Sequence, residues 1–578
     1  MTTASQVRQL PLGISDFKLI KKQNCYYVDK TMFIPQMEVT SNYLFLVRPR
    51  RFGKSLLLSM LRAYYDVNMR ERFNELFGHL SIGSNPTPLQ GRYAVLHLDF
   101  SLVFGPIEKL QDNFDAYCGM MCETFAQQYE ELFYDGFAAE VKAAANAGGK
   151  LNLIGRQAKM HEVPLYLIVD EYDNFTNTVL NQHGEDKYTS LTHGEGFYRD
   201  IFKSFKANFE RVLMLGVSPV TMDDLTSGYN IATNITADAA FNQMLGFSEE
   251  EVHEMFRYYK DAGWLKGDID AMLDEMRPWY DNYCFARESL AAESKVYNSN
   301  MVLYYLSSQI GEGHAPYEMN DPNARTDYQK MKRLIQLDRL EPQRKSIIYQ
   351  IAEQGYIDSN IVPYFPASDI VKFDNFVSLL YYYGMLTITG TRGNKLRLGI
   401  PNNNVRKQYY GYLLEEYDRI RYSDHQRIDN AFDSAALDGQ WQPLMQVIGE
   451  EYEKTCAVRC LIEGERNIQG FFTAYLTMST YYLTAPELEL AHGYCDFFLM
   501  PDLRRYPMVA HSYIIELKYL KPEATEAEAE AQWAEAAAQV RHYATDAKLP
   551  QLCGSTQLHL VVAQFRGHHL ERTGEITD

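Results

Sequence analysis

The stretch YLFLVRPRRFGKSLLLSML, residues 43–61, decides how the first half of the chain folds. Its opening five residues, Tyr43–Val47, are a continuous apolar run, as in a strand that a parallel sheet buries on both faces. A basic turn with one glycine follows, and then a segment that favours a helix. This order of strand, turn and helix predicts a phosphate-binding loop, because backbone N–H groups of the turn and the helix N-terminus both face the anion.

Residues of this turn have the chemistry that a nucleoside triphosphate needs. Gly53 lets the backbone approach the phosphates closely, Lys54 would neutralise the β- and γ-phosphates of ATP, and the Ser55 hydroxyl would coordinate Mg²⁺. Arg51 could also contact phosphate, although a solvent-facing arginine fits the pattern equally well. Arg48 stands where the general motif has its first glycine, so a basic surface turn ahead of a helix remains the alternative.

Further apolar runs predict the rest of a parallel sheet, with helices between its strands: Ala94–Leu98, Leu165–Val169 and Val212–Val217. The second of them ends in Asp170 and Glu171, where a P-loop ATPase holds Mg²⁺ with one carboxylate and polarises the attacking water with the next. We therefore assign Asp170 to the metal and Glu171 to the base. Asp173 fits a surface acid better than a helper, and Ser218 follows the third run where a hydroxyl could contact the γ-phosphate.

Several segments of the first half resemble the AAA-ATPase-like family of bacterial proteins. The resemblance rests on the loop itself and on YYVDKT (26–31), IVDEYD (168–173), GVSPVTMDDLTSGYNIATNIT (216–236), LGFSEEEV (245–252) and WYDNYCF (279–285). It implies a P-loop ATPase of the AAA+/STAND type, commonly followed by a nuclease-like domain. It also implies ATP binding at Gly53, Lys54, Ser55 and Asp170, in a loop that lacks the first glycine throughout the family.

Carboxylates near the C-terminus suggest a second kind of chemistry. Asp496 interrupts an apolar strand near Cys495–Met500, and on the strand Tyr513–Leu517 the spacing of Glu516 and Lys518 puts both on one face. Two acids that hold Mg²⁺ and a nearby cation are what metal-dependent phosphodiester cleavage requires. This Asp…Glu-x-Lys pattern is that of the restriction-endonuclease-like, PD-(D/E)xK, nucleases. It lacks the proline that often precedes the acid, so a degenerate fold that only binds is an alternative.

Three more residues of the C-terminal part are candidates for this site. Gln539 and Tyr543 share one helix face and resemble the Q-x-x-x-Y helix of RecB-type nucleases. Glu489 lies one strand upstream of Asp496 and is either a further ligand or a surface glutamate. The predicted elements are a helix over 470–483, the two strands, a Glu/Ala-rich helix over 523–538 and a last strand at Leu558–Ala563.

The chain is thus predicted to be an α/β multidomain protein with four segments. They are a P-loop parallel-sheet ATPase (1–245), a helical lid (246–360), a winged-helix-like segment (361–437) and a restriction-endonuclease-like α/β domain (438–578). The helical part opens with Ser248 and Glu251 at capping-box spacing. The third segment has a helix, a strand, a turn with glycine and another strand, and its arginines and lysines form either a DNA-binding patch or part of an interdomain contact.

Composition narrows the functions further. The 578 residues include 56 Lys and Arg against 75 Asp and Glu, a net charge of −19, which argues against a general polyanion binder and confines DNA to a local site. Eight cysteines are too sparse for a disulfide scaffold and fit buried thiols in a reducing cytoplasm. The N-terminus lacks the apolar core of a signal peptide, and no apolar run reaches the length of a membrane helix.

Three functions compete on this basis. The first is an ATP-controlled, Mg²⁺-dependent nuclease that cleaves DNA, in defence or in mobile-element biology. The second is a nucleotide-dependent switch or scaffold whose nuclease-like domain is inactive and only binds. The third is a P-loop kinase-like transferase, which the Asp170–Asp173 strand end and the long C-terminal half disfavour. The sequence assigns no arginine finger and no oligomeric state.

Overall fold

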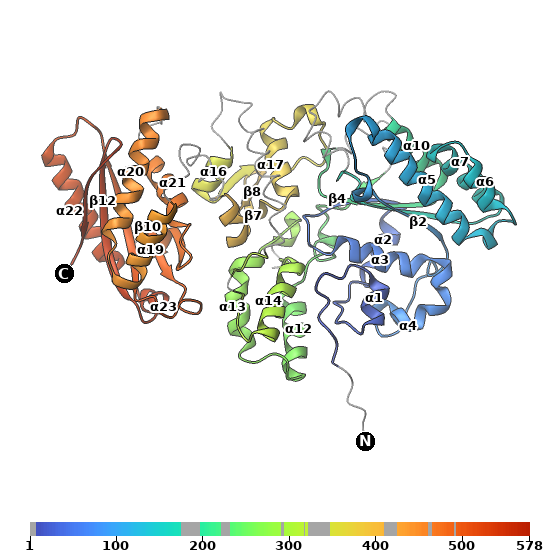
Figure 1. Ribbon diagram of the computed structural model, residues 1–578, viewed down its shortest axis with the longest axis horizontal. Coiled ribbons are helices and arrows are strands. Elements are labelled where there is room, and N and C mark those ends of the chain that lie inside the picture. The colour runs from blue at the N-terminus through green and yellow to red at the C-terminus, as the bar shows by residue number, and fades with distance from the viewer. Residues whose placement is uncertain are drawn as a thin grey trace, which may run out of the picture. The chain divides into compact units, whose positions relative to one another are not determined.

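The computed structural model describes residues 7–174, 197–220, 232–290, 294–316, 318–321, 347–409, 425–459, 465–490 and 493–577. The chain forms two compact units (Figure 1). The first comprises residues Met1–Ile347 and Gly355–Val405, and the second comprises Ile348–Gln354 and Arg406–Asp578.

A five-stranded parallel sheet organises the first unit. Its strands are β1 (Tyr43–Val47), β2 (Ala94–Asp99), β3 (Leu165–Asp170), β4 (Arg211–Gly216) and β5 (Thr233–Asn234), in the spatial order β2-β3-β4-β1-β5. The four apolar runs therefore form four adjoining parallel strands, as predicted, and their side chains are largely buried. Because the strands are parallel, their carboxyl ends meet at one edge, where β1 enters the basic turn and β3 ends in Asp170.

Helices cover both faces of this sheet. Figure 1 shows α3 on one face and α5, α7 and α10 on the other. The described helices of this region are α1 (Phe17–Lys22), α2 (Phe33–Thr40), α3 (Lys54–Tyr65), α4 (Phe73–Phe77), α5 (Leu110–Gln128), α6 (Phe137–Ala143), α7 (Ala147–Met160) and α10 (Phe197–Asn208). Cys118 and Cys122 of α5 are buried free thiols.

Three helices follow the sheet in the chain: α12 (Glu249–Asp261), α13 (Ile269–Tyr280) and α14 (Ser299–Gly311). The predicted capping box is present, since Ser248 accepts from the Glu251 backbone N–H and the Glu251 carboxylate accepts from the Ser248 N–H. Helix α14 begins at an Asn298 cap whose side chain accepts from the Met301 N–H.

A small antiparallel sheet completes the first unit. Its strands β6 (Tyr356–Ser359), β7 (Thr387–Arg392) and β8 (Lys395–Gly399) lie in the order β6-β8-β7, and α17 (Phe373–Tyr382) precedes the hairpin, as predicted. Asp358 forms ion pairs with both Arg392 and Arg397. This single carboxylate offsets one of the positive charges considered for DNA binding.

The second unit is a five-stranded mixed sheet with helices. Strands β9 (Tyr482–Leu490), β10 (Gly493–Pro501), β11 (His511–Leu520), β12 (Gln557–Arg566) and β13 (His569–Glu575) lie in the order β13-β12-β11-β10-β9. Only β11 and β12 pair in parallel. The described helices are α16 (Ile347–Gln354), α19 (His425–Asp438), α20 (Gln442–Arg459), α21 (Glu465–Leu476), α22 (Glu526–Tyr543) and α23 (Leu549–Cys553).

One expected boundary in this unit is wrong. The sequence predicts a helix over 470–483, but α21 ends at Leu476 and the chain enters β9 at Tyr482. The residues at this boundary are aromatic and aliphatic and have no strict periodicity. Such a run fits a buried helix and a strand equally well, so the sequence did not locate the boundary.

Helix α22 packs Ala536 and Val540 against Phe498 and Ile514 of the sheet. Within the described residues, no helix combines the length and hydropathy needed to cross a membrane.

Candidate functional site

The turn after β1 has the backbone conformation of a phosphate loop. Gly53 has a φ of +91° and caps α3, and Arg51 has a φ of +70°, which a residue with a Cβ adopts only when its surroundings hold it there. The Arg48 N–H donates to the Gly216 carbonyl, so the loop begins as an extension of the β1–β4 pairing. The tight turn and the N-terminus of α3 therefore adjoin at the predicted phosphate-binding site.

The first two side chains of α3 lie beside the acids that end β3. The Lys54 ammonium group is buried, donates to the carbonyls of Arg48 and Pro49 at 3.2 Å each, and lies 3.8 Å from a carboxylate oxygen of Glu171. The Ser55 hydroxyl donates to Asp170 Oδ2 at 2.7 Å. The fold thus brings together Lys54, Ser55, Asp170 and Glu171 from two elements more than a hundred residues apart.

Asp170 is the deepest acid of this group, with 4% of the residue exposed. Burial raises its pKa to about 6, against the opposing hydrogen bond from Ser55. Asp99 of β2 lies beside it in register. A buried carboxylate next to a hydroxyl is an oxygen donor set that suits Mg²⁺, whose charge would also compensate the cost of burying the acid. Glu171 follows with a φ of +50°, and its N–H donates to Asp170 Oδ1.

Asp173 and Ser218 define the adjoining turn after β4. Asp173 is buried and accepts from the N–H groups of Val217 and Ser218, the shorter contact being 2.7 Å. Its carboxylate therefore shapes the backbone and is no surface acid, contrary to the expectation. The Ser218 hydroxyl is buried and accepts from the Val220 N–H at 3.3 Å, at the end of the strand that lies between β1 and β3.

Arg48 has a role that the sequence did not reveal. Its guanidinium is buried, donates to the carbonyls of Thr236 and Phe241, and lies 4.2 Å from the centre of the Phe285 ring. Burial lowers its pKa to about 10. In place of the first glycine of the general motif, the chain thus uses an arginine that ties the loop to the segments around residues 236–241 and 285. The sequence contained one indication of this contact: the segments RPRR and WYDNYCF, which contain Arg48 and Phe285, both carry the resemblance to the same family.

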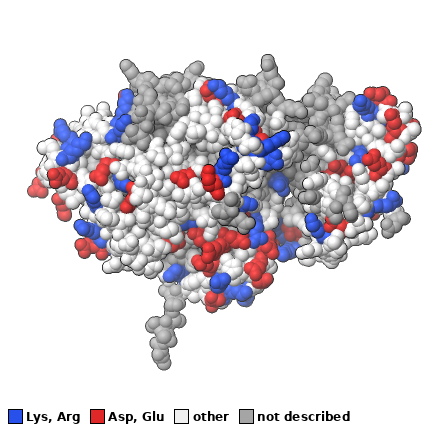
Figure 2. Space-filling view, turned by 180° about the vertical axis from the view of Figure 1, so that it is seen from behind, with Lys and Arg blue, Asp and Glu red and all other residues white. Residues whose placement is uncertain are grey.

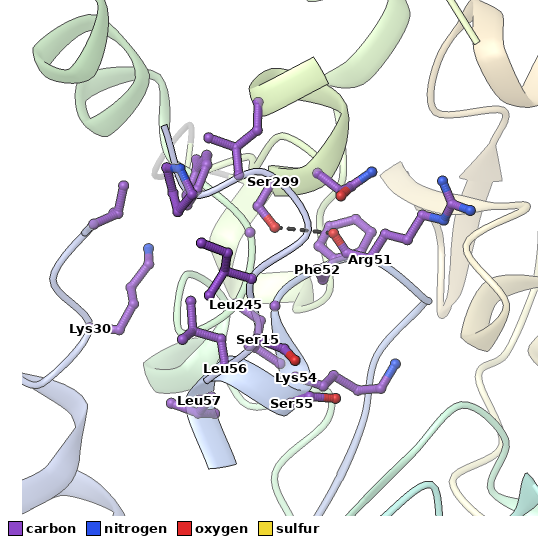
Figure 3. Close-up of a pocket in the computed structure, with 18 of the residues that line it drawn as sticks. Ser15, Lys30, Arg51, Phe52, Lys54, Ser55, Leu56, Leu57, Leu245 and Ser299 are labelled. Carbon is purple, nitrogen blue, oxygen red and sulfur yellow. Dashed lines mark hydrogen bonds between the residues drawn. The ribbon is translucent and has the colours of Figure 1, made fainter. Parts of the chain in front are cut away.

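A cavity of about 310 Å³ adjoins this loop (Figure 3). Its wall includes the loop and the start of α3, the N-terminal segment around Gly13–Ser15 and Tyr26–Val28, and residues 244–247. Figure 3 places Lys30 and Leu245 across from the loop and shows Ser299 donating to the Arg51 carbonyl. The side chain of Arg51 forms an ion pair with Asp321 at 3.0 Å. A largely apolar cavity next to a phosphate loop has room for the base and sugar of a nucleotide.

The carboxylates of the second unit meet where two strands part. The β10–β11 ladder ends at Phe497 and Ile515. Beyond that pair, the Asp496 N–H donates to Glu516 Oε2 at 3.4 Å, and the Leu517 N–H donates to Asp496 Oδ2 at 2.6 Å. The Lys518 ammonium donates to Glu516 Oε1 at 2.9 Å. Asp496, Glu516 and Lys518 therefore form one contiguous group, as the pattern predicts.

A glutamine from α21 joins this group, and the sequence prediction missed it. Gln469 Nε2 donates to Asp496 Oδ1 at 2.6 Å. Its signal in the sequence is weak: one amide ahead of the apolar run of residues 470–472. Glu516 has only 3% of the residue exposed, and its carboxylate forms an ion pair with Lys518.

Of the two candidates on α22, Tyr543 lies next to the group. The Tyr543 hydroxyl donates to the Tyr494 carbonyl at 2.9 Å, and burial together with Glu516 and Asp496 raises its pKa to about 12. Gln539 has a buried Oε1 that finds no hydrogen-bond partner in the described structure. Glu489 of β9 pairs with Tyr494 of β10. Tyr494 lies two residues before Asp496 on the same strand, so Glu489 is offset from Asp496 by two positions along the sheet.

Two carboxylates form the donor set here. Within the described ranges, no cluster of three or more His, Cys, Asp or Glu side chains could hold a metal ion. Two carboxylates with a neighbouring lysine nevertheless fit Mg²⁺, which usually keeps several waters and binds protein through one or two carboxylates. The chemistry of the residues present therefore agrees with a hydrated divalent ion and not with a closed structural site.

Comparison with protein families defines the class of each unit. Residues 11–226 match the family model described as predicted AAA-ATPase, and residues 463–575 match the model of the PD-(D/E)XK nuclease superfamily. The chain therefore has an AAA-ATPase-like domain and a C-terminal domain of the PD-(D/E)XK nuclease superfamily. Both resemblances found in the sequence are confirmed, and so is the fold class that they imply.

Individual relatives are more distant. An uncharacterized protein in the vnfD 5′ region of Azotobacter chroococcum mcd 1 is 29% identical over 289 residues, which are 49% of this chain and 50% of that protein. This chain thus spans about half the length of that relative. Solved structures of ORC2 from Aeropyrum pernix, in ADPNP and ADP complexes, and of Cdc6p from Pyrobaculum aerophilum each have 10% identity. Each alignment covers 72% of this chain and 97% of the other, with TM-scores of 0.31 and 0.24.

Proposed function

We propose that the first unit binds and hydrolyses ATP with Mg²⁺. Support comes from the contact between Ser55 and the buried Asp170, the adjoining Lys54 and the cavity beside the loop. The ammonium group of Lys54 donates hydrogen bonds to two backbone carbonyls, which are weaker acceptors than phosphate oxygens. Gly53, Arg51 and Ser218 complete the set that we assign to the nucleotide.

Glu171 is the residue that we assign to water activation. Its carboxylate follows the assigned Mg²⁺ ligand Asp170 directly and lies 3.8 Å from Lys54. A carboxylate at this place can accept a proton from, or orient, a water that attacks the γ-phosphate.

For the second unit we propose phosphodiester cleavage in DNA. The observation that carries this proposal is the meeting of Asp496, Glu516 and Lys518 where β10 and β11 part. Asp496 and Glu516 would hold Mg²⁺, which supplies Lewis-acid stabilisation of charge at the phosphate when it is bound. Lys518 orients Glu516 and would contact a water or a phosphate oxygen. We assign Gln539 and Tyr543 to the same site, and Glu489 is the further ligand candidate.

Charge restricts how DNA reaches such a site. Figure 2 shows Lys and Arg side chains scattered among Asp and Glu, with acidic side chains gathered at the lower middle of that face. With a net charge of −19, the protein gains little from long-range attraction of DNA, so binding depends on local contacts.

We further propose that the winged-helix-like segment transmits the nucleotide state, and that the cytoplasmic role lies in defence or mobile-element biology.

The test is incubation of the full chain with DNA, Mg²⁺ or Mn²⁺, and ATP. Wild type should cleave DNA only with the divalent ion, and Asp496→Ala and Lys518→Ala should each abolish cleavage. A matched control is Asp502→Ala, which removes a carboxylate just beyond the end of the same strand, where it pairs with Arg505. Cleavage that Asp496→Ala leaves unchanged would contradict the assignment.

A nucleotide-dependent switch with an inactive nuclease fold is the second candidate. One observation favours it: both carboxylate oxygens of Asp496 already accept short hydrogen bonds, from Leu517 and Gln469. Such a protein would bind ATP in a Lys54-dependent way and would bind DNA without cutting it. The same incubation, with DNA binding measured alongside, separates the two functions.

A further inference from the structure

Arg51 is a cation of the phosphate loop that the chain itself neutralises. Its Nη1 donates to Asp321 Oδ2 at 3.0 Å, and only 8% of Asp321 is exposed. Asp321 lies ten residues beyond the end of α14 and also accepts from Asn300 Nδ2 at 3.4 Å. An acid from a distant part of the chain thus reaches into the rim of the loop.

The N-terminal turn of α14 holds the backbone of the same loop. The Arg51 carbonyl accepts from the Ser299 hydroxyl at 3.1 Å and from the Asn300 N–H at 3.3 Å, and the Arg50 carbonyl accepts from Asn298 Nδ2 at 3.5 Å. These contacts, with the Asp321 pair, support the positive φ of Arg51. The carbonyls of Arg50 and Arg51 are therefore held by residues 298–300 at the start of α14.

Arg51 borders two cavities at once. One is the 310 Å³ cavity beside the phosphate loop, and the other, of about 890 Å³, lies along α14 and includes Asp321 and Asn300 in its wall. The long arginine side chain can therefore turn from one to the other without crossing the core. A triphosphate offers it several negative charges and the bidentate oxygens that a guanidinium prefers.

We propose that Asp321 competes inside the chain with a nucleoside triphosphate for Arg51. This inference rests on the proposed function of the loop and goes beyond it, because it assigns a role to Asp321 and sets the affinity of the site. Without nucleotide, Asp321 holds the guanidinium. With ATP and Mg²⁺ in the loop, Arg51 exchanges the carboxylate for phosphate oxygens, and the contact between the loop and Asp321 is released.

If Asp321 competes with ATP, removing its charge should tighten ATP binding. If Asp321 only supports the loop structurally, removing its charge should weaken ATP binding. Asp321→Asn should tighten binding of ATP about tenfold, because the exchange no longer breaks an ion pair and a negative charge near the phosphates is gone. Arg51→Ala should weaken binding about tenfold. In the Arg51→Ala background, Asp321→Asn should change the affinity much less than it does in the wild type, since a double-mutant cycle isolates the pair.

Binding of ATP with Mg²⁺ to the full chain, measured by calorimetry, provides the test. Glu318→Gln is the matched control: it removes the same charge three residues away and should leave the affinity unchanged. Thermal unfolding checks that each variant is folded, and Asp321→Ala serves where Asp321→Asn does not fold.

Two results would overturn the inference. One is an Asp321→Asn affinity that is equal to or weaker than that of wild type, which would make Asp321 a scaffold for the loop. The other is an equal gain with and without Arg51, which would make Asp321 a mere source of repulsion. We expect Lys54→Ala not to bind ATP. If the wild-type protein also fails to bind ATP, the proposed function is overturned as well.

Discussion

Asp496 is the residue on which the proposed chemistry of the second unit depends. Its two oxygens accept from the Leu517 N–H and from the Gln469 amide, each at 2.6 Å. One contact fixes the carboxylate against the neighbouring strand, and the other fixes it against α21. A carboxylate held from two sides keeps its orientation, which a divalent ion with strict geometry requires.

Removing the amide of Gln469 should therefore weaken the metal site without removing a ligand. We expect Gln469→Ala to lower Mg²⁺-dependent cleavage about 10- to 100-fold and to raise the Mn²⁺ concentration needed for half-maximal rate. Gln446→Ala, which removes an exposed amide that pairs with Glu450 on α20, is the control and should have no effect. An unchanged metal dependence in Gln469→Ala would show that the amide does not position Asp496.

Asp281 shows a different consequence of burying an acid. It follows the end of α13, has 5% of the residue exposed, and its Oδ1 has no hydrogen-bond partner in the described structure. Burial raises its pKa to about 6, so the folded state binds a proton more tightly than the unfolded state does. Stability therefore falls as the pH rises from the unfolded pKa, near 4, to about 6.

The substitution Asp281→Asn should stabilise the first unit above that window. We expect a gain of about 2 kcal/mol at pH 7, seen as a higher melting temperature, because the neutral amide carries no charge to desolvate. The difference from wild type should shrink as the pH falls through 4, because below that pH the wild-type carboxyl becomes protonated in both states. A gain that is equal at pH 4 and pH 7 would contradict a titration origin.

Residue patterns predicted part of these sites and not the rest. Period-two spacing relates Glu516 to Lys518, and an acid in an apolar strand marks Asp496, so this group could be found in the sequence. Arg48 and Gln469 could not, because their partners come from distant segments: the carbonyls of residues 236 and 241, and Asp496. Asp173 appeared to be a surface acid because its N–H partners belong to the turn after β4.

At the scale of elements, the turn between α17 and β7 packs against the phosphate loop. Gly384 has a φ of +74°, and a Cβ at this position would lie 2.8 Å from Pro49 Cγ. The same segment is tied to the loop through Phe285, which lies under Arg48 and whose carbonyl accepts from the Tyr381 hydroxyl. The helix–hairpin segment therefore contacts the loop after β1 within the first unit.

Substitution of Gly384 tests this contact. Gly384→Ala should cost about 1–3 kcal/mol of stability and also weaken ATP binding, since the added methyl must displace Pro49. Gly393→Ala is the control: its φ is +62°, but a Cβ there meets nothing within 4 Å. It should cost about 1 kcal/mol and leave the affinity unchanged. Thermal unfolding and calorimetry measure both, and equal affinities in the two variants would show that the contact does not reach the loop.

The elements were predicted unequally well for a physical reason. Strands β1 to β4 are continuous apolar runs because helices cover both faces of the parallel sheet, and this leaves a strong signal. The boundary between α21 and β9 left none, since residues 477–481 carry neither a helix-stopping glycine nor a proline. Strand pairing and the parting of β10 from β11 depend on long-range contacts that no local pattern encodes.

At the scale of the whole molecule, the chain has two candidate sites in two compact units. If nucleotide controls cleavage, the rate of DNA cleavage by wild type should change by at least severalfold when ATP is added with Mg²⁺. Lys54→Ala should not respond to ATP, because it lacks the cation that holds the phosphates, yet it should keep its basal rate. The control Lys395→Ala removes an exposed lysine of β8 and should respond as wild type does. A Lys54→Ala protein that still responds would contradict the control mechanism.

The central claim is that Asp496 and Glu516 hold a divalent ion beside Lys518. The most direct measurement is anomalous diffraction from a crystal of the full chain that contains Mn²⁺. We predict one manganese peak about 2.1 Å from oxygens of both carboxylates, and none there in a crystal of Asp496→Asn. A manganese ion elsewhere, with both side chains still in the hydrogen bonds described above, would contradict the claim.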